Sequence, residues 1–85
     1  MRVGIAGYGV VGKTRHLSIE ANTSFQVTAI SEKNTKAREA ISSDVKIYGD
    51  YKDLIADADI DVIFISLPNQ FAAEASSLSL QKGLH

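Results

Sequence analysis

The stretch Val3-Gly4-Ile5-Ala6-Gly7-Tyr8-Gly9-Val10-Val11-Gly12 decides how this 85-residue chain begins to fold. Its first four residues form a short apolar run of the length and character of a β-strand. Three glycines interrupt the run, and apolar residues then recur roughly at helical spacing as far as Ala21. The stretch therefore predicts a strand, a tight turn and a helix, in that order.

The same alternation continues along the rest of the chain. Further strands are expected at residues 25–30, 45–48 and 61–65. The expected helix signals are Asn34 or Thr35, Asp50 and Asn69 as N-terminal caps, and Gly83 as a C-terminal stop. Because each helix returns the chain across the sheet, the strands should run parallel. We predict an α/β fold of Rossmann type, a doubly wound parallel sheet of about four strands in the order 3-2-1-4 with helices on both faces.

The composition fits one small folded domain and excludes several kinds of site. The chain is 45% hydrophobic and 22% charged, as is ordinary for a globular domain. Its net charge of −1 offers no basic field for nucleic acid or for an anionic membrane surface. It contains no cysteine, which excludes disulfides and thiolate metal ligands. There is neither an export signal nor an apolar run near the roughly 20 residues of a membrane span, so we expect a cytoplasmic protein.

Residues 7–12, Gly7-Tyr8-Gly9-Val10-Val11-Gly12, match the spacing G-x-G-x-x-G between a strand and a helix. Gly7 permits the tight turn, Gly9 lacks the Cβ that would block a diphosphate, and Gly12 lets the helix pack closely on the sheet. Free N–H groups and the dipole at the helix N-terminus attract a diphosphate without any lysine. We predict a dinucleotide site here; the alternative is a glycine-rich turn that only connects strand to helix.

The charged pair Glu32-Lys33 stands at the end of the second expected strand, about 20 residues after Gly12. A carboxylate at this place accepts hydrogen bonds from the hydroxyls of the adenosine ribose, which favours NAD. Lys33 could accommodate the 2′-phosphate of NADP, whereas Glu32 would repel it. We expect NAD or NADP as cofactor, with NAD favoured. The alternative for both side chains is a solvated charge at a strand end.

A second loop, Ser66-Leu67-Pro68-Asn69, follows the fourth expected strand. In the strand order 3-2-1-4 it faces the glycine loop across the crevice, near where the nicotinamide half of a dinucleotide would lie. Pro68 also suits the start of a helix and Asn69 suits a cap. These structural roles are compatible with cofactor contact.

With these motifs in place, the chain resembles the Gfo/Idh/MocA family of oxidoreductases over nearly its whole length. The resemblance covers Gly4 to Gly9, Gly12 to Leu17, Val27 to Glu32, Tyr48 to Tyr51 and Asp59 to Val62. Its most specific part is Leu67-Pro68-Asn69 followed by Gln81-Lys82-Gly83-Leu84-His85, which is similar to the family's Pro-Asn motif and Gly-Lys-His ending. Other Rossmann enzymes, such as homoserine dehydrogenase, share the glycine loop but usually not the second motif.

The resemblance implies a parent enzyme that transfers hydride between NAD(P) and a sugar, a sugar derivative or a polyol. Gly7 to Gly12 would hold the diphosphate, Glu32 and Lys33 the adenosine ribose, and Ser66 to Asn69 the nicotinamide side. Residues 1–85 would form an incomplete NAD(P)-binding domain, with the C-terminal substrate domain absent. The family's Glu-Lys-Pro motif would lie beyond His85, so we assign no catalytic residue.

One more departure from the family, the histidines, the aspartates and an alternative function complete the expectations. Ala72 stands where the family often has a histidine, and neither His16 nor His85 has a carboxylate or metal-ligand pattern near it in sequence. Asp57, Asp59 and Asp61 are expected to be solvated turn residues. The alternative function is a non-catalytic nucleotide-binding or structural fragment. A fourth strand at the edge of the sheet would favour self-association.

Overall fold

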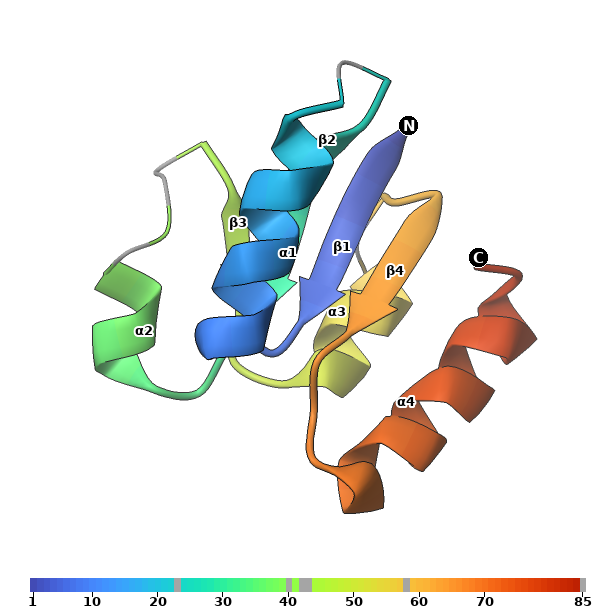
Figure 1. Ribbon diagram of the computed structural model, residues 1–85. Coiled ribbons are helices and arrows are strands. Elements are labelled where there is room, and N and C mark those ends of the chain that lie inside the picture. Colours follow the sequence, from blue (N-terminus) through green and yellow to red (C-terminus); the bar gives the residue numbers. More distant parts are fainter. Residues whose placement is uncertain (23, 40, 42–43, 58, 85) are drawn as a thin grey trace.

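The computed structural model describes residues 1–22, 24–39, 41, 44–57 and 59–84, with the backbone alone at 10, 11, 13, 15 and 57 (Figure 1). Strands and helices alternate throughout this part of the chain. The strands are β1 (Arg2–Ala6), β2 (Gln26–Ser31), β3 (Lys46–Tyr48) and β4 (Val62–Ile65). The helices are α1 (Val10–Glu20), α2 (Thr35–Glu39), α3 (Tyr51–Asp57) and α4 (Asn69–Lys82).

The four strands form one sheet in the order β3-β2-β1-β4, with every neighbouring pair parallel. This confirms the predicted topology. The register aligns the last residues of the strands, because Ala6 pairs with Ser31 on one side and with Ile65 on the other, and Ser31 pairs with Tyr48. All four carboxyl ends therefore reach the same edge of the sheet.

Apolar side chains pack against both faces of the sheet, which confirms the doubly wound prediction. On one face Ile19 of α1 packs with Ile5 and Ile30 of the sheet. On the opposite face Leu54 of α3 and Ala75 of α4 join a second cluster. In Figure 1, α1 crosses in front of the sheet and α3 lies behind it. The two clusters hold the carboxyl ends of the strands in place from both sides.

Polar caps fix where α2 and α3 begin, as predicted. The Asn34 side chain accepts hydrogen bonds from the amides of Lys36 and Ala37, at 2.9 and 3.2 Å. Asp50 accepts one from the amide of Lys52 at 2.9 Å. These side chains satisfy amides that have no carbonyl partner within the helix.

The expectation that Asn69 caps α4 is wrong, because Asn69 is the first residue of that helix. Pro68 occupies the cap position, and its carbonyl accepts hydrogen bonds from the amides of Phe71 and Ala72, both at 2.9 Å. At the other end Gly83 adopts φ = 83° and stops the helix, as predicted.

The fully buried Leu54 tests how far stability depends on packing under α3. Leu54→Ala should lower the free energy of unfolding by about 2–5 kcal/mol, because it leaves a cavity between helix and sheet. Leu80→Ala is the matched control, since Leu80 is 75% exposed on α4 and its truncation should change the value by less than about 0.5 kcal/mol. Urea denaturation measures both. Equal effects would contradict the described core.

Candidate functional site

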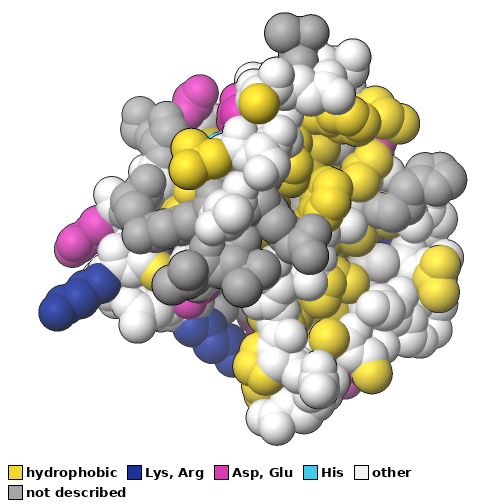
Figure 2. Space-filling model, in the orientation of Figure 1, with side chains coloured by type: hydrophobic (Ala, Val, Ile, Leu, Met, Phe, Trp, Pro, Cys, Tyr) yellow, Lys and Arg dark blue, Asp and Glu magenta, His cyan; other side chains and the backbone are white. Residues whose placement is uncertain are grey.

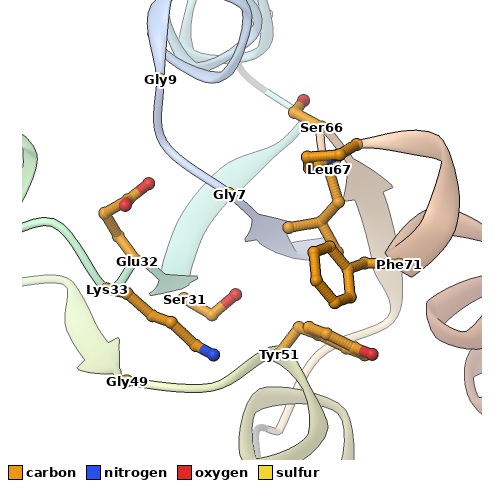
Figure 3. Close-up of a pocket in the computed structure, with 11 residues that line it drawn as sticks. Gly7, Gly9, Ser31, Glu32, Lys33, Gly49, Tyr51, Ser66, Leu67 and Phe71 are labelled. Carbon is orange, nitrogen blue, oxygen red and sulfur yellow. The ribbon is translucent and has the colours of Figure 1, made fainter.

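A cavity of about 240 Å³ opens at the carboxyl edge of the sheet, where parallel α/β sheets bind ligands (Figure 3). Loops that follow all four strands contribute to its wall. The lining residues are Gly7, Gly9, Ser31, Glu32, Lys33, Gly49, Tyr51, Ser66, Leu67, Pro68 and Phe71. Of the predicted site residues, the cavity brings together part of each loop and the charged pair, namely Gly7, Gly9, Glu32, Lys33, Ser66, Leu67 and Pro68.

The three glycines of residues 7–12 have different surroundings. Gly7 adopts φ = 92°, and a Cβ there would stand 2.6 Å from the carbonyl oxygen of Ser66. A Cβ at Gly12 would stand 2.4 Å from the carbonyl oxygen of Gly7. A Cβ at Gly9 would meet no atom within 4 Å. Gly7 and Gly12 are therefore required by the turn itself, whereas Gly9 leaves space beside the cavity.

The start of α1 is suited to an anion. Gly9 is the N-cap residue and provides no side-chain cap, and the first turn contains no acidic residue. The helix thus presents its positive end and its first amides at the cavity rim. Ser66 Oγ is buried and has no hydrogen-bond partner among the described residues. The uncapped start of α1 and the space at Gly9 fit the diphosphate of a dinucleotide.

Two backbone amides hold the carboxylate of Glu32. Glu32 Oε1 accepts a hydrogen bond from Tyr8 N at 2.6 Å, and Oε2 accepts one from Asn34 N at 2.9 Å. A carboxylate has about four acceptor sites, so each oxygen retains capacity for a ligand hydroxyl. Figure 3 shows this carboxylate directed toward the segment at Gly9, and the Lys33 side chain extended toward Tyr51. The charged pair therefore has one member tied to the glycine loop and one directed across the cavity.

Other predicted residues lie away from the cavity wall. Tyr8 is only 6% exposed and belongs to the core cluster, Gly12 lies beneath the turn, and Asn69 is exposed at the start of α4. The side chains of Val10 and Val11 lie outside the described part of the structure. Any contact of Tyr8 or Gly12 with a ligand would thus be made by the backbone.

An aromatic wall was missed by sequence reasoning. The rings of Tyr51 on α3 and Phe71 on α4 lie 6.3 Å apart and line the cavity beside Leu67 (Figure 3). Tyr51 donates a hydrogen bond to Glu74, which raises the pKa of Tyr51 to about 12 and lowers that of Glu74. A signal was present in the sequence, because both rings lie in the first turn of a helix that follows a strand. That position places a side chain at the carboxyl edge of a parallel sheet.

His16 and two of the three aspartates make specific contacts in the structure. The statement that no carboxylate lies near His16 is wrong, because His16 Nε2 lies 3.0 Å from Glu20 Oε1, one helical turn away. Asp59 and Asp61 pair with Arg2 at the opposite end of β1 from the cavity.

Within the described residues, no group of three metal-ligating side chains is found. No helix in the described part of the chain is long and apolar enough to span a membrane.

Comparisons with known proteins agree with this geometry. A family model described as an oxidoreductase family with an NAD-binding Rossmann fold (GFO_IDH_MocA) matches residues 1–85. The chain is 34% identical over 87 residues to the uncharacterized oxidoreductase YdgJ of Escherichia coli, across 100% of this chain and 25% of that protein. It is 27% identical over 88 residues to D-xylose 1-dehydrogenase (NADP(+)) 2 of Haloferax volcanii, across 100% of this chain and 27% of that protein.

A solved structure of a dehydrogenase has the same fold. Scyllo-inositol dehydrogenase from Lactobacillus casei, with bound cofactor NAD(H) and scyllo-inositol, matches with a TM-score of 0.86 and 25% identity. The match covers 100% of this chain and 26% of that chain. The chain thus spans about a quarter of the length of the relatives it matches.

The contrast between two glycines provides a test of the loop. Gly12→Ala should lower the free energy of unfolding by about 1–3 kcal/mol, because the added Cβ meets a backbone oxygen that cannot easily move. An alanine inside a helix is otherwise more favourable than glycine. Gly9→Ser should leave stability unchanged or slightly raised, since its Cβ enters open space and serine is a good N-cap. Urea denaturation compares the two, and a stabilised Gly12→Ala variant would contradict the described turn.

Proposed function

Because the chain belongs to the Gfo/Idh/MocA family of oxidoreductases with an NAD-binding Rossmann fold, we propose that it provides the cofactor site of an enzyme that transfers hydride between a nicotinamide dinucleotide and a sugar, a sugar derivative or a polyol. The observation that carries the proposal is the open space at Gly9 beside the uncapped start of α1. That arrangement suits a diphosphate and has no role in connecting strand to helix.

The proposed roles follow the order of groups in a dinucleotide. The backbone of residues 7–12 holds the diphosphate, and Glu32 accepts the hydroxyls of the adenosine ribose. Tyr51, Phe71 and Leu67 offer an apolar wall in the same cavity, which suits the adenine ring. Contact of residues 66–69 with the nicotinamide side stays a prediction. The nicotinamide supplies the hydride chemistry when bound, and this chain binds and orients the cofactor.

The preference for NAD over NADP rests on Glu32. Two amides fix its carboxylate at the end of β2, where a 2′-phosphate would meet a negative charge that cannot swing away freely. Lys33 is exposed and long, so its charge is screened by solvent and is less firmly placed. One relative is named for NADP(+) and one solved structure contains NAD(H), so the relatives favour neither cofactor and the proposed preference rests on Glu32.

The substrate class is proposed from the relatives alone. One relative is named for D-xylose and one solved structure contains scyllo-inositol, and both compounds carry several hydroxyl groups. The described residues of this chain include no assigned catalytic acid or base. The chain's own contribution, under this proposal, ends at cofactor binding. A non-catalytic nucleotide-binding role is the second candidate, and it predicts the same affinity without turnover.

We also propose that the chain self-associates through β4. This strand is at the edge of the sheet, and all four of its residues are half-buried. An exposed strand edge offers unpaired N–H and C=O groups to a second chain. Figure 2 shows apolar side chains at the surface over this part of the sheet, beside α1. Phe25 and Phe64 line a groove there, so a second copy would cover apolar surface as well as pair its edge.

Calorimetric titration with NAD and with NADP tests the cofactor proposal. The wild-type chain should bind NAD more tightly than NADP. Gly9→Val should lose measurable affinity while it retains its circular dichroism spectrum, because the side chain fills the space meant for the diphosphate. Glu32→Gln should weaken NAD binding roughly tenfold or more, since hydrogen bonds to a charged group contribute about 1.5–3 kcal/mol. A folded wild-type chain that binds neither nucleotide would overturn the proposal.

Sedimentation velocity over a concentration series tests association through β4. The wild-type chain should form a dimer, and the fraction of chains in the dimer should rise with protein concentration. Leu80→Ser should behave identically, since Leu80 is an exposed apolar residue on α4 rather than on the strand edge. A clean monomer at the highest concentration would refute the proposal, and so would a dimer that disappears in Leu80→Ser.

A further inference from the structure

Tyr8 is the one residue between the two glycines that border the cavity, and it is held from two sides. Its backbone N–H donates to Glu32 Oε1 at 2.6 Å. Its ring is buried in the cluster beneath α1, with 6% of the residue exposed. Gly7 and Gly9 leave the flanking backbone with more freedom than any other residues would. The position of Tyr8 therefore decides the conformation of the loop.

The phenol of Tyr8 begins a chain of hydrogen bonds that runs along α1. Tyr8 OH lies 2.7 Å from His16 Nδ1, and the two rings meet edge to face with centroids 5.6 Å apart. His16 Nε2 lies 3.0 Å from Glu20 Oε1. A neutral imidazole with its proton on Nε2 donates to Glu20 and accepts from Tyr8, so one tautomer satisfies both contacts. Burial raises the pKa of Tyr8, and Glu20 raises it further, which keeps the phenol protonated as a donor.

We propose that His16 and Glu20 are positioning residues for cofactor binding. They hold the phenol of Tyr8 and thereby fix the backbone N–H of Tyr8, which donates a hydrogen bond to Glu32. The inference rests on the proposed function, because the loop and Glu32 are the groups that receive the dinucleotide. His16 is not among the residues that line the cavity, and its side chain is 14% exposed. The pair acts through Tyr8 alone.

The geometry exceeds what helix stability requires. An exposed ion pair four residues apart on a helix adds little stability and needs no third partner. Here the imidazole is largely buried and its second nitrogen is directed to a loop residue eight positions earlier. The resulting chain links four residues in the order Glu20, His16, Tyr8 and Glu32, and Tyr8 contacts His16 through its phenol and Glu32 through its backbone amide. A loop ordered before binding loses less conformational entropy when the ligand arrives.

A double-mutant cycle with Tyr8→Phe and His16→Leu tests the proposal by NAD affinity. Each single variant should weaken binding roughly three- to tenfold, the ratio that corresponds to loss of one hydrogen bond. The double variant should bind no more weakly than either single variant, because both remove the same contact. His16→Asn should retain most of the affinity for NAD, since the amide oxygen of asparagine can accept the hydrogen bond from the phenol of Tyr8. Leu17→Ala is the control on the same helix, with a side chain 76% exposed, and should bind like the wild type.

Hydrogen exchange of the residue 8 amide provides a readout that needs no nucleotide. Tyr8→Phe and His16→Leu should lower its protection by a factor similar to the loss of affinity, while the amides of β1 keep theirs. Unchanged protection and affinity in both variants would overturn the positioning role, even if the wild type binds NAD well. If the two variants lower the protection of this amide but the wild type binds no nucleotide, His16 still positions the loop and the cofactor proposal is rejected instead.

Discussion

The close approach of Gly7 to the end of β4 is the constraint on which the rest of the structure depends. A side chain at residue 7 would collide with the carbonyl oxygen of Ser66, and its φ of 92° suits only glycine. The N–H of Gly7 bonds to Ser31 at 2.9 Å, and the N–H of Ser66 bonds to Ala6 at 2.8 Å, so the ladder extends one residue beyond the strands. The loops that follow β1, β2 and β4 therefore begin at the same edge of the sheet, and the cavity forms between them.

Glu32 ties this backbone arrangement together at the proposed binding site. Its amide bonds to the carbonyl of Tyr48 at 2.9 Å and its side chain bonds to Tyr8, so one residue joins the ends of three strands. Arg38 of α2 donates to the Glu32 carbonyl at 2.5 Å and fixes it from the other side. The carboxylate is therefore positioned before any ligand arrives, which lowers the ordering cost of binding.

The sequence predicted the parts that depend on local pattern. The alternation of apolar runs was sufficient for the strand order, and Asn34 and Asp50 were recognisable as caps because each precedes a helical run. Asn69 was misassigned because Pro68 takes the cap position and provides its carbonyl instead of a side chain. The aromatic wall was invisible for another reason: Tyr51 and Phe71 are 20 residues apart, and only the packing of α3 on α4 brings them together. The pair of His16 and Glu20 could have been found, since four residues separate neighbours on a helix.

A chain of net charge −1 has to attract an anionic ligand through local fields. The net charge offers no long-range steering, and Glu32 adds negative charge to the cavity. The uncapped start of α1 opposes this with its partial positive charge, which falls off within the first turn and so acts only on a group lodged at Gly9. The site therefore separates two demands in space: positive charge where a diphosphate would lie, and a carboxylate where hydroxyls would. A ligand with phosphate at both places fits this arrangement less well than one with a diphosphate and a free ribose, which is the physical basis for favouring NAD.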